Sequence, residues 1–421
     1  MKALKGNIIF TSSPEKFEVF ENSYLVESKG KVYGIFKKLP QHLKNIKIHN
    51  FGKSLIIPGF VDLHFHAPQF QNIGIGYDEE LLEWLNKYTF PEEAKYDNEE
   101  YAKRLYKKVA KEIWRNGTTR VSLLSTIHRN ATEILMDIFH KAGIGAYVGK
   151  VNMDRNSPDY YIESTEESLS VTKDWILKTK DKYPLVKPII TPRFVPACSE
   201  KLMRGLADLA EKYDIKIQSH LSENQEEVEW VKSLHPEYET YAHVYDAMGL
   251  LNEDTVMAHA VYSNEKEIEL LAERKSFVAH CPNANYNLAS GIMPLRRFID
   301  AGVKIGLGTD VGAGHQVGIY KVMSQAIQAS KIKWLESGKK EEYLTTSEAF
   351  YLGTKGGGRF FGKVGSFEKG YSFDALVIDD KNLGDRDIRS IEERLQRFIY
   401  CGDDRNIIKR YVEGKVLCEP I

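Results

Sequence analysis

The sequence predicts an α/β protein: a (β/α)8 barrel of the TIM type, flanked by a small β-sandwich that both ends of the chain form. Three observations predict this fold. From Phe60 onward, apolar strand-like runs alternate with amphipathic helical stretches, which favours parallel strands joined by crossover helices. The two ends instead carry short β-patterned runs broken by Gly, Pro and Asn. At 421 residues, the chain is long enough for a barrel of about 250 residues and an attached module.

The expected boundaries follow from where these patterns change. Residues 1–58 and 358–421 are expected to form the β-sandwich module, and residues 59–357 the barrel. The expected elements of the module are strands at 6–11, 31–36, 54–57, 374–379 and 410–416, and a helix at 388–398. The expected barrel strands are 61–66, 118–126, 146–151, 186–194, 216–220, 256–261, 277–281 and 303–310, with amphipathic helices such as 102–116 and 200–213 between them.

Charge and cysteine content limit the classes of partner. Lys and Arg number 58 against 59 Asp and Glu, so a net charge of -1 predicts no nucleic-acid partner and no anionic membrane. A small-molecule ligand fits better. The four cysteines are scattered, which argues against a disulfide scaffold and favours a reducing cytoplasm. Neither a signal-peptide core nor a membrane span is evident, so we expect a soluble protein.

A His-x-His pair, His64 and His66, ends the first barrel strand in the run PGFVDLHFH (58–66). Alternate residues of a strand share one face, so both imidazoles point the same way. Two neutral nitrogen donors on a stiff strand supply half of a tetrahedral site for an ion such as Zn²⁺. Such pairs also occur by chance, so the interpretation depends on partners elsewhere in the chain.

Three partners fall at the ends of other predicted strands: His220, His259 and Asp310. Active groups of a barrel lie at the C-terminal ends of its strands. Singly, each histidine could be a hydrogen-bonded core residue, and Asp310, before two glycines, could be a turn residue. Together the set predicts a catalytic metal site of imidazoles and one carboxylate with an open position for water.

Glu223 follows His220 by three residues, so the chain must turn after His220 to bring this carboxylate over the metal. There it could take a proton from the attacking water and pass it to the leaving amine. The alternative is an exposed acid that opens the charged helix at 225–232.

Three further residues are candidates for reading a planar ring. Arg193 offers parallel donors to a pair of adjacent acceptors, and Phe194 could stack on the ring. Gln69 carries both a donor and an acceptor, so it could read the edge of a heterocycle. The alternatives are an ion pair at the barrel rim for Arg193 and a solvent-facing loop position for Gln69.

The run PGFVDxHxH, the later histidines and GTD (308–310) resemble the amidohydrolase superfamily, whose members hydrolyse C–N bonds on a metal-bearing barrel. Within it, five segments resemble the guanine deaminases: HAPQ (66–69), WLNKYTFP (84–91), TPRF (191–194), SHLSEN (219–224) and GDDRNI (402–407).

The resemblance implies hydrolysis of guanine to xanthine and ammonia, and a homodimer. It also implies one zinc per chain, with Fe able to use the same site, and a proton shuttle at Glu223. The implied ligands are His64, His66, His220 and Asp310. His259 would orient the water or the substrate, Asp310 would also help to deprotonate or hold the nucleophile, and Gln69, Arg193 and Phe194 would contact guanine.

Two rival functions stay open. One is a deaminase or chlorohydrolase of the same fold that acts on a pterin, triazine or adenine-like ring. The other is a non-catalytic assembly protein that kept the fold, which the intact set of His, Asp and Glu residues argues against.

Overall fold

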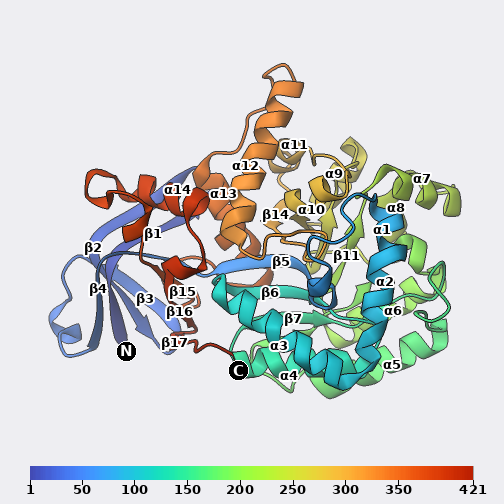
Figure 1. Cartoon of the computed structure of the whole chain (residues 1–421), viewed down its shortest axis with the longest axis horizontal. Coiled ribbons are helices and arrows are strands. Elements are labelled where there is room, and N and C mark those ends of the chain that lie inside the picture. The colour runs from blue at the N-terminus through green and yellow to red at the C-terminus, as the bar shows by residue number, and fades with distance from the viewer. Residues whose placement is uncertain (421) are drawn as a thin grey trace.

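The computed structural model describes residues 1–420, and its strands belong to one terminal sheet and one α/β body (Figure 1). Seven strands from the two ends form a single sheet in the order β17-β16-β15-β4-β1-β2-β3. Their bounds are β1 Lys2–Ser13, β2 Lys16–Ser28, β3 Lys31–Phe36, β4 Lys47–Pro58, β15 Ala375–Ile378, β16 Ile407–Val412 and β17 Lys415–Val416. The two ends meet where β4 pairs with β15 in antiparallel register.

The body contains two four-stranded parallel sheets, β5-β6-β7-β9 and β11-β12-β13-β14, and the parallel pair β8 and β10. The bounds are β5 Phe60–His66, β6 Thr118–Leu124, β7 Gly145–Gly149, β8 Val151–Asn152, β9 Val186–Pro188, β10 Thr191–Pro192, β11 Ile217–Leu221, β12 Thr255–His259, β13 Phe277–His280 and β14 Lys304–Leu307. This mixed α/β content with parallel strands agrees with the predicted fold class.

Three predicted strands are broken in the structure. The expected strand 410–416 is divided into β16 and β17, which pair in antiparallel register because the chain turns at Glu413 and Gly414. The expected strand 186–194 is divided into β9 and β10, each ending in a proline, because proline has no N–H to donate to the ladder. The expected strand 146–151 is divided at Lys150, just after Gly149, and a glycine weakens a strand interior. The strand ends therefore carry short irregular segments, from which Arg193 and Phe194 reach inward.

Fourteen α-helices accompany these strands across the described residues. They are α1 Leu81–Trp84, α2 Phe90–Ala94, α3 Glu99–Arg115, α4 Arg129–Ala142, α5 Thr165–Thr179, α6 Glu200–Tyr213, α7 Gln225–Leu234, α8 Tyr241–Ala247, α9 Glu265–Glu273, α10 Pro282–Asn287, α11 Leu295–Asp300, α12 Ile319–Glu336, α13 Thr346–Tyr351 and α14 Ile391–Cys401. A π-helical turn, Leu85–Thr89, joins α1 to α2. The helix expected at 388–398 begins later, because a Ser390–Glu393 capping box fixes its start. No helix within residues 1–420 is long and apolar enough to cross a membrane.

The parallel pairing places the carboxyl ends of the body strands at one edge. In the two sheets, His66 lies beside Leu124 and His259 beside Leu221. Backbone hydrogen bonds also connect the two sheets: the Asp310 N–H donates to the His64 carbonyl at 2.8 Å, and the Ile190 N–H donates to the Lys216 carbonyl at 2.8 Å. The predicted site residues therefore converge at this edge.

Candidate active site

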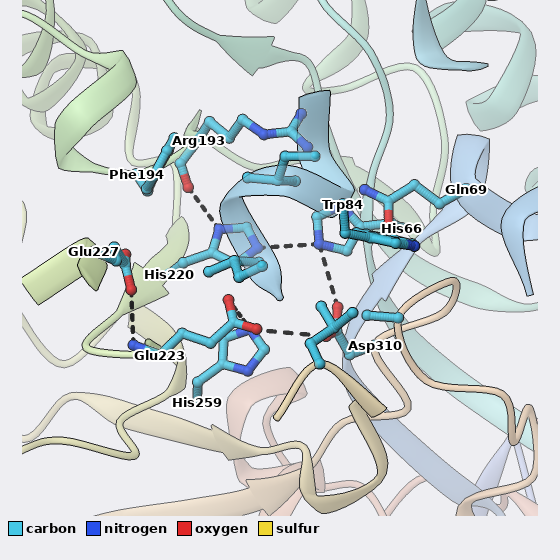
Figure 2. Close-up of a pocket in the computed structure, with 14 residues that line it drawn as sticks. His66, Gln69, Trp84, Arg193, Phe194, His220, Glu223, Glu227, His259 and Asp310 are labelled. Atoms are coloured by element: carbon cyan, nitrogen blue, oxygen red, sulfur yellow. Dashed lines mark hydrogen bonds and ion pairs between the residues drawn. The ribbon is translucent and has the colours of Figure 1, made fainter. Parts of the chain in front are cut away.

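Three imidazoles and one carboxylate meet at the strand ends. The Nε2 atom of His66 lies 3.1 Å from Nε2 of His64 and 3.1 Å from Nε2 of His220. The Oδ1 atom of Asp310 lies 3.2 Å from Nε2 of His64 and 3.3 Å from Nε2 of His66. Figure 2 shows the His66, His220 and Asp310 side chains directed toward one another. The four residues expected as metal ligands are thus brought together.

The electrostatics of this cluster suit a cation. Burial, together with the neighbouring His64 ring, holds the pKa of both His66 and His220 well below the usual range of histidine. Nδ1–H of His220 donates to the Arg193 carbonyl at 2.6 Å, so its Nε2 lone pair faces the cluster. Tetrahedral donors around Zn²⁺, at bond lengths of about 2.0–2.1 Å, lie about 3.3 Å apart. The donor types and spacings therefore fit one divalent metal ion.

A buried carboxylate behind the cluster ties two of its strands together. Asp62 accepts hydrogen bonds from the backbone N–H groups of His64, at 3.2 Å, and Thr309, at 3.0 Å. The Thr309 hydroxyl donates to the same carboxylate at 2.6 Å. Burial raises the pKa of Asp62 to about 7. These contacts fix the relative position of His64 and Asp310, which come from opposite ends of the body.

Glu223 points into the site because the chain turns sharply after β11. Ser222 has a left-handed backbone, with φ of 46°, and the Glu223 N–H donates to Oε2 of Glu227 at 2.9 Å. The Glu223 side chain is buried, so the alternative of an exposed helix-opening acid is wrong. Burial, and then the carboxylates of Asp310 and Glu227, raise its pKa well above the usual range. A carboxyl group in this state can hold a proton near neutral pH.

His259 lies beside both Glu223 and the ligand cluster. Its Nε2 is 3.4 Å from Oε2 of Glu223 and 3.8 Å from Oδ2 of Asp310. Its Nδ1 pairs with Oδ1 of Asn285 at 2.9 Å, which fixes the ring orientation. Burial lowers the pKa of His259 to about 4, so the ring is neutral near pH 7. Asn285 was not among the residues predicted from the sequence, because a single asparagine gives no distinctive signal.

Arg193, Phe194 and Gln69 line the same cavity. Arg193 is only 2% exposed, so it does not lie at the barrel rim, where the alternative interpretation placed it. It does form an ion pair, however: its two terminal nitrogens contact Oε2 and Oε1 of Glu93 at 2.7 and 3.2 Å. Gln69 donates to Oε1 of Glu93 at 2.8 Å, and its buried position excludes the solvent-facing alternative.

Sequence reasoning missed Glu93 and the apolar part of the wall. Glu93 follows the WLNKYTFP segment by two residues, but an acidic pair after proline is typical of an exposed first helical turn. The remaining apolar lining comes from side chains on α1, the π-helical turn and two later loops: Leu81, Trp84, Leu85, Leu288 and Ala313. Trp84 and Leu85 lie within that segment, so the resemblance was a usable signal for them.

Comparisons with known proteins identify the family of this chain and the activities of similar proteins. The Amidohydrolase family matches residues 55–417, so the chain belongs to this family of metal-dependent hydrolases. A guanine deaminase of Dictyostelium discoideum is 40% identical, over 98% of this chain and 97% of its own length. A guanine deaminase of Escherichia coli is 34% identical, over 100% of this chain and 98% of its own length.

A solved structure agrees with these relatives. The guanine deaminase of C. acetobutylicum, with guanine bound in its active site, superposes with a TM-score of 0.98. It is 53% identical and covers 99% of this chain and 100% of its own. The family resemblance expected from the sequence is therefore confirmed.

Proposed function

We infer that this protein hydrolyses guanine to xanthine and ammonia. One observation carries the inference: a single pocket is lined by three of the four proposed metal ligands (His66, His220 and Asp310), the Glu223 carboxyl group and the Arg193 and Gln69 side chains. Full-length relatives at 34–40% identity are guanine deaminases, which confirms the activity expected from the sequence. The same comparisons confirm that the protein is a hydrolase that acts on C–N bonds of cyclic amidines.

We propose that one Zn²⁺ per chain is held by His64, His66, His220 and Asp310, with Fe able to use the same donors. When bound, such a metal lowers the pKa of a coordinated water to about 7 and so supplies hydroxide near neutral pH. The neutral imidazoles and their convergent Nε2 atoms support this assignment.

Glu223 is proposed to move the protons. Its carboxyl group, 3.4 Å from His259, accepts a proton from the attacking water and donates it to the ring or to the departing amine. Asp310 helps to hold and deprotonate the nucleophile, and His259 orients the water or the substrate. Attack at C2 of guanine gives a tetrahedral intermediate, which collapses with loss of ammonia.

Recognition of the ring is proposed for Arg193, Phe194 and Gln69. Guanine presents O6 and N7 as adjacent acceptors, which two parallel Arg donors pair well. Because Glu93 occupies the terminal edge of Arg193, the donors for guanine are on the side edge, Nε–H and one Nη N–H. The Phe194 ring and the apolar wall hold the purine flat and exclude water.

We also propose that the barrel is closed and that the terminal sheet forms a sandwich. Hydrogen bonds between the two parallel sheets support a closed eight-stranded barrel within 59–357. A shared apolar core that includes Val32 of β3 and Tyr411 of β16 supports a terminal sheet curled into a β-sandwich of 1–58 and 358–421. The four free cysteines support a cytoplasmic setting, and the family resemblance supports a homodimer.

The function is tested by measuring ammonia release from the purified protein across a panel of purines, pyrimidines, pterins and triazines. Metal content is measured on the same preparation. We expect the fastest release from guanine and about one metal ion per chain. Faster release from a pterin or triazine would replace guanine with that ring as the substrate. No release from any ring by metal-loaded protein would instead support the assembly-protein alternative.

A further inference from the structure

Glu93 is the common partner of the residues that face the purine. Its Oε1 accepts from Gln69 and from one terminal nitrogen of Arg193, and its Oε2 accepts from the other terminal nitrogen. The Tyr161 hydroxyl donates to the same Oε2 at 2.9 Å. A carboxylate offers about four acceptor positions, and all four are used. Glu93 is fully buried, so its charge is matched by Arg193 and not by water.

The geometry of this contact decides which part of Arg193 remains free. Both terminal nitrogens bind Glu93, one to each oxygen, which is the end-on arrangement. Among the described residues, the Nε–H of Arg193 has no hydrogen-bond partner. The guanidinium plane rests over the Phe90 ring, 4.9 Å from its centroid. Phe90 and Glu93 lie one turn apart on α2, so this short helix holds both the face and the edge of the guanidinium.

The pair also sets the charge of the wall. Arg193 alone would give the cavity an unmatched positive charge in a region of low dielectric. With Glu93 in contact, the wall is a neutral array of directed donors. Such a wall suits a neutral ring with adjacent acceptors and gives no net attraction to an anion.

We propose that Glu93 is a positioning residue that determines specificity: it turns Arg193 and Gln69 toward the purine and keeps the wall neutral, so that neutral guanine binds and the acidic product leaves. This inference rests on the proposed function. Xanthine loses a proton more readily than guanine, so it is an anion in mildly alkaline solution. A neutral wall holds this anion weakly, whereas an unmatched arginine would retain it.

The test measures equilibrium binding of two purines that are not deaminated, hypoxanthine and xanthine, to metal-loaded protein at mildly alkaline pH. Hypoxanthine keeps O6 and N7 of guanine and is neutral, and xanthine is the anion. The Glu93→Gln change keeps the size of the side chain and removes its charge. In this variant we expect the Kd for xanthine, divided by the Kd for hypoxanthine, to fall about tenfold or more. The KM for guanine should rise more than kcat falls.

Glu92→Gln is the matched control. Glu92 precedes Glu93 on the same helix and is also buried, but it accepts from Tyr101 and Lys95 and does not line the cavity. The ratio of Kd values in this variant should stay within about twofold of the parent. An equal shift in both variants would assign the effect to the stability of α2 and overturn the proposal.

A second variant separates charge from shape. Glu93→Asp keeps the charge and withdraws the carboxylate, so affinity for both purines should fall while the preference for hypoxanthine remains. If Glu93 had a purely structural role, the isosteric Glu93→Gln variant would change the preference for hypoxanthine less than Glu93→Asp does. That result, or no binding of hypoxanthine to the parent protein, would overturn the proposal. Absence of guanine turnover with these Kd shifts intact would refute only the proposed function.

Discussion

The cavity has two walls that are built in different ways. The ligand wall consists of strand ends, where histidines converge and where burial, together with the neighbouring His64 ring, lowers the pKa of His66 and His220. The ring wall consists of short helices and broken strands, where the carboxylate of Glu93 matches the charge of Arg193. In this cavity, rigid backbone places the proposed metal ligands, whereas side-chain pairing places the proposed donors to the ring. Four experiments test this contrast.

The largest effect is expected from the ligand wall. His64→Ala or Asp310→Ala removes one of four convergent donors, so bound metal should fall well below one per chain and ammonia release should be abolished. Metal analysis and an activity assay measure this on the same sample. His42→Ala, at an exposed site in the terminal module, is the control and should keep both. Full metal occupancy in the two site variants would refute the ligand assignment.

Glu223→Gln tests the proton path between the walls. The change keeps the size of the side chain and removes its ability to accept a proton, so kcat should fall by about 10² or more. Metal content should stay at the parental level. Glu226→Gln, on the exposed first turn of α7, serves as the control. Near-parental turnover in Glu223→Gln would show that another group moves the proton.

Arg193→Gln tests the ring wall through specificity. Losing one good bidentate contact costs about 1–3 kcal/mol, so kcat/KM for guanine should fall by about tenfold to a hundredfold. The preference for guanine over 2,6-diaminopurine should narrow, because glutamine can also accept from the 6-amino group. The comparison needs kcat/KM for both purines in both proteins, with the surface variant Arg129→Gln as control. An unchanged ratio would mean that a different residue reads the ring.

The last experiment measures stability instead of activity. His280 is buried at the end of β13, and burial lowers its pKa to about 3, below the unfolded value of 6.5. The unfolded chain therefore binds one more proton between these pH values, and stability falls as pH drops through that window. The slope is about 1.4 kcal/mol per pH unit for this group. Urea unfolding at several pH values should show a shallower loss in His280→Asn, and parallel curves would contradict the assignment.

The ligand wall could be predicted from the sequence because the position of each ligand depends only on the strand that carries it. A histidine or aspartate that ends an apolar run must lie at the carboxyl edge of a parallel sheet, whatever its partners are. The ring wall could be predicted only in part, since Arg193 was identified but its orientation depends on Glu93, far away in the chain. Strand β2 was also missed, because its first half is charged and mostly solvent-exposed.

The backbone of the site was beyond prediction as well. His259 and Asp310 have left-handed conformations, with φ of 76° and 49°. Non-glycine residues rarely adopt these values, and surrounding contacts must hold them there. No periodicity in the sequence signals such a turn, although the turn after His220 could be inferred from the need to aim Glu223.

The pairing of β4 with β15 gives the protein a dependence on the order of synthesis. Strand β4 leaves the ribosome early, whereas its neighbour β15 is made about 320 residues later. Until then β4 presents the apolar, unpaired edge formed by Leu55, Ile56 and Ile57. A nascent chain that stalls within the helices of the body would thus expose a strand ready to pair with another chain. Protection of that edge during translation is the cost of building one sheet from both ends.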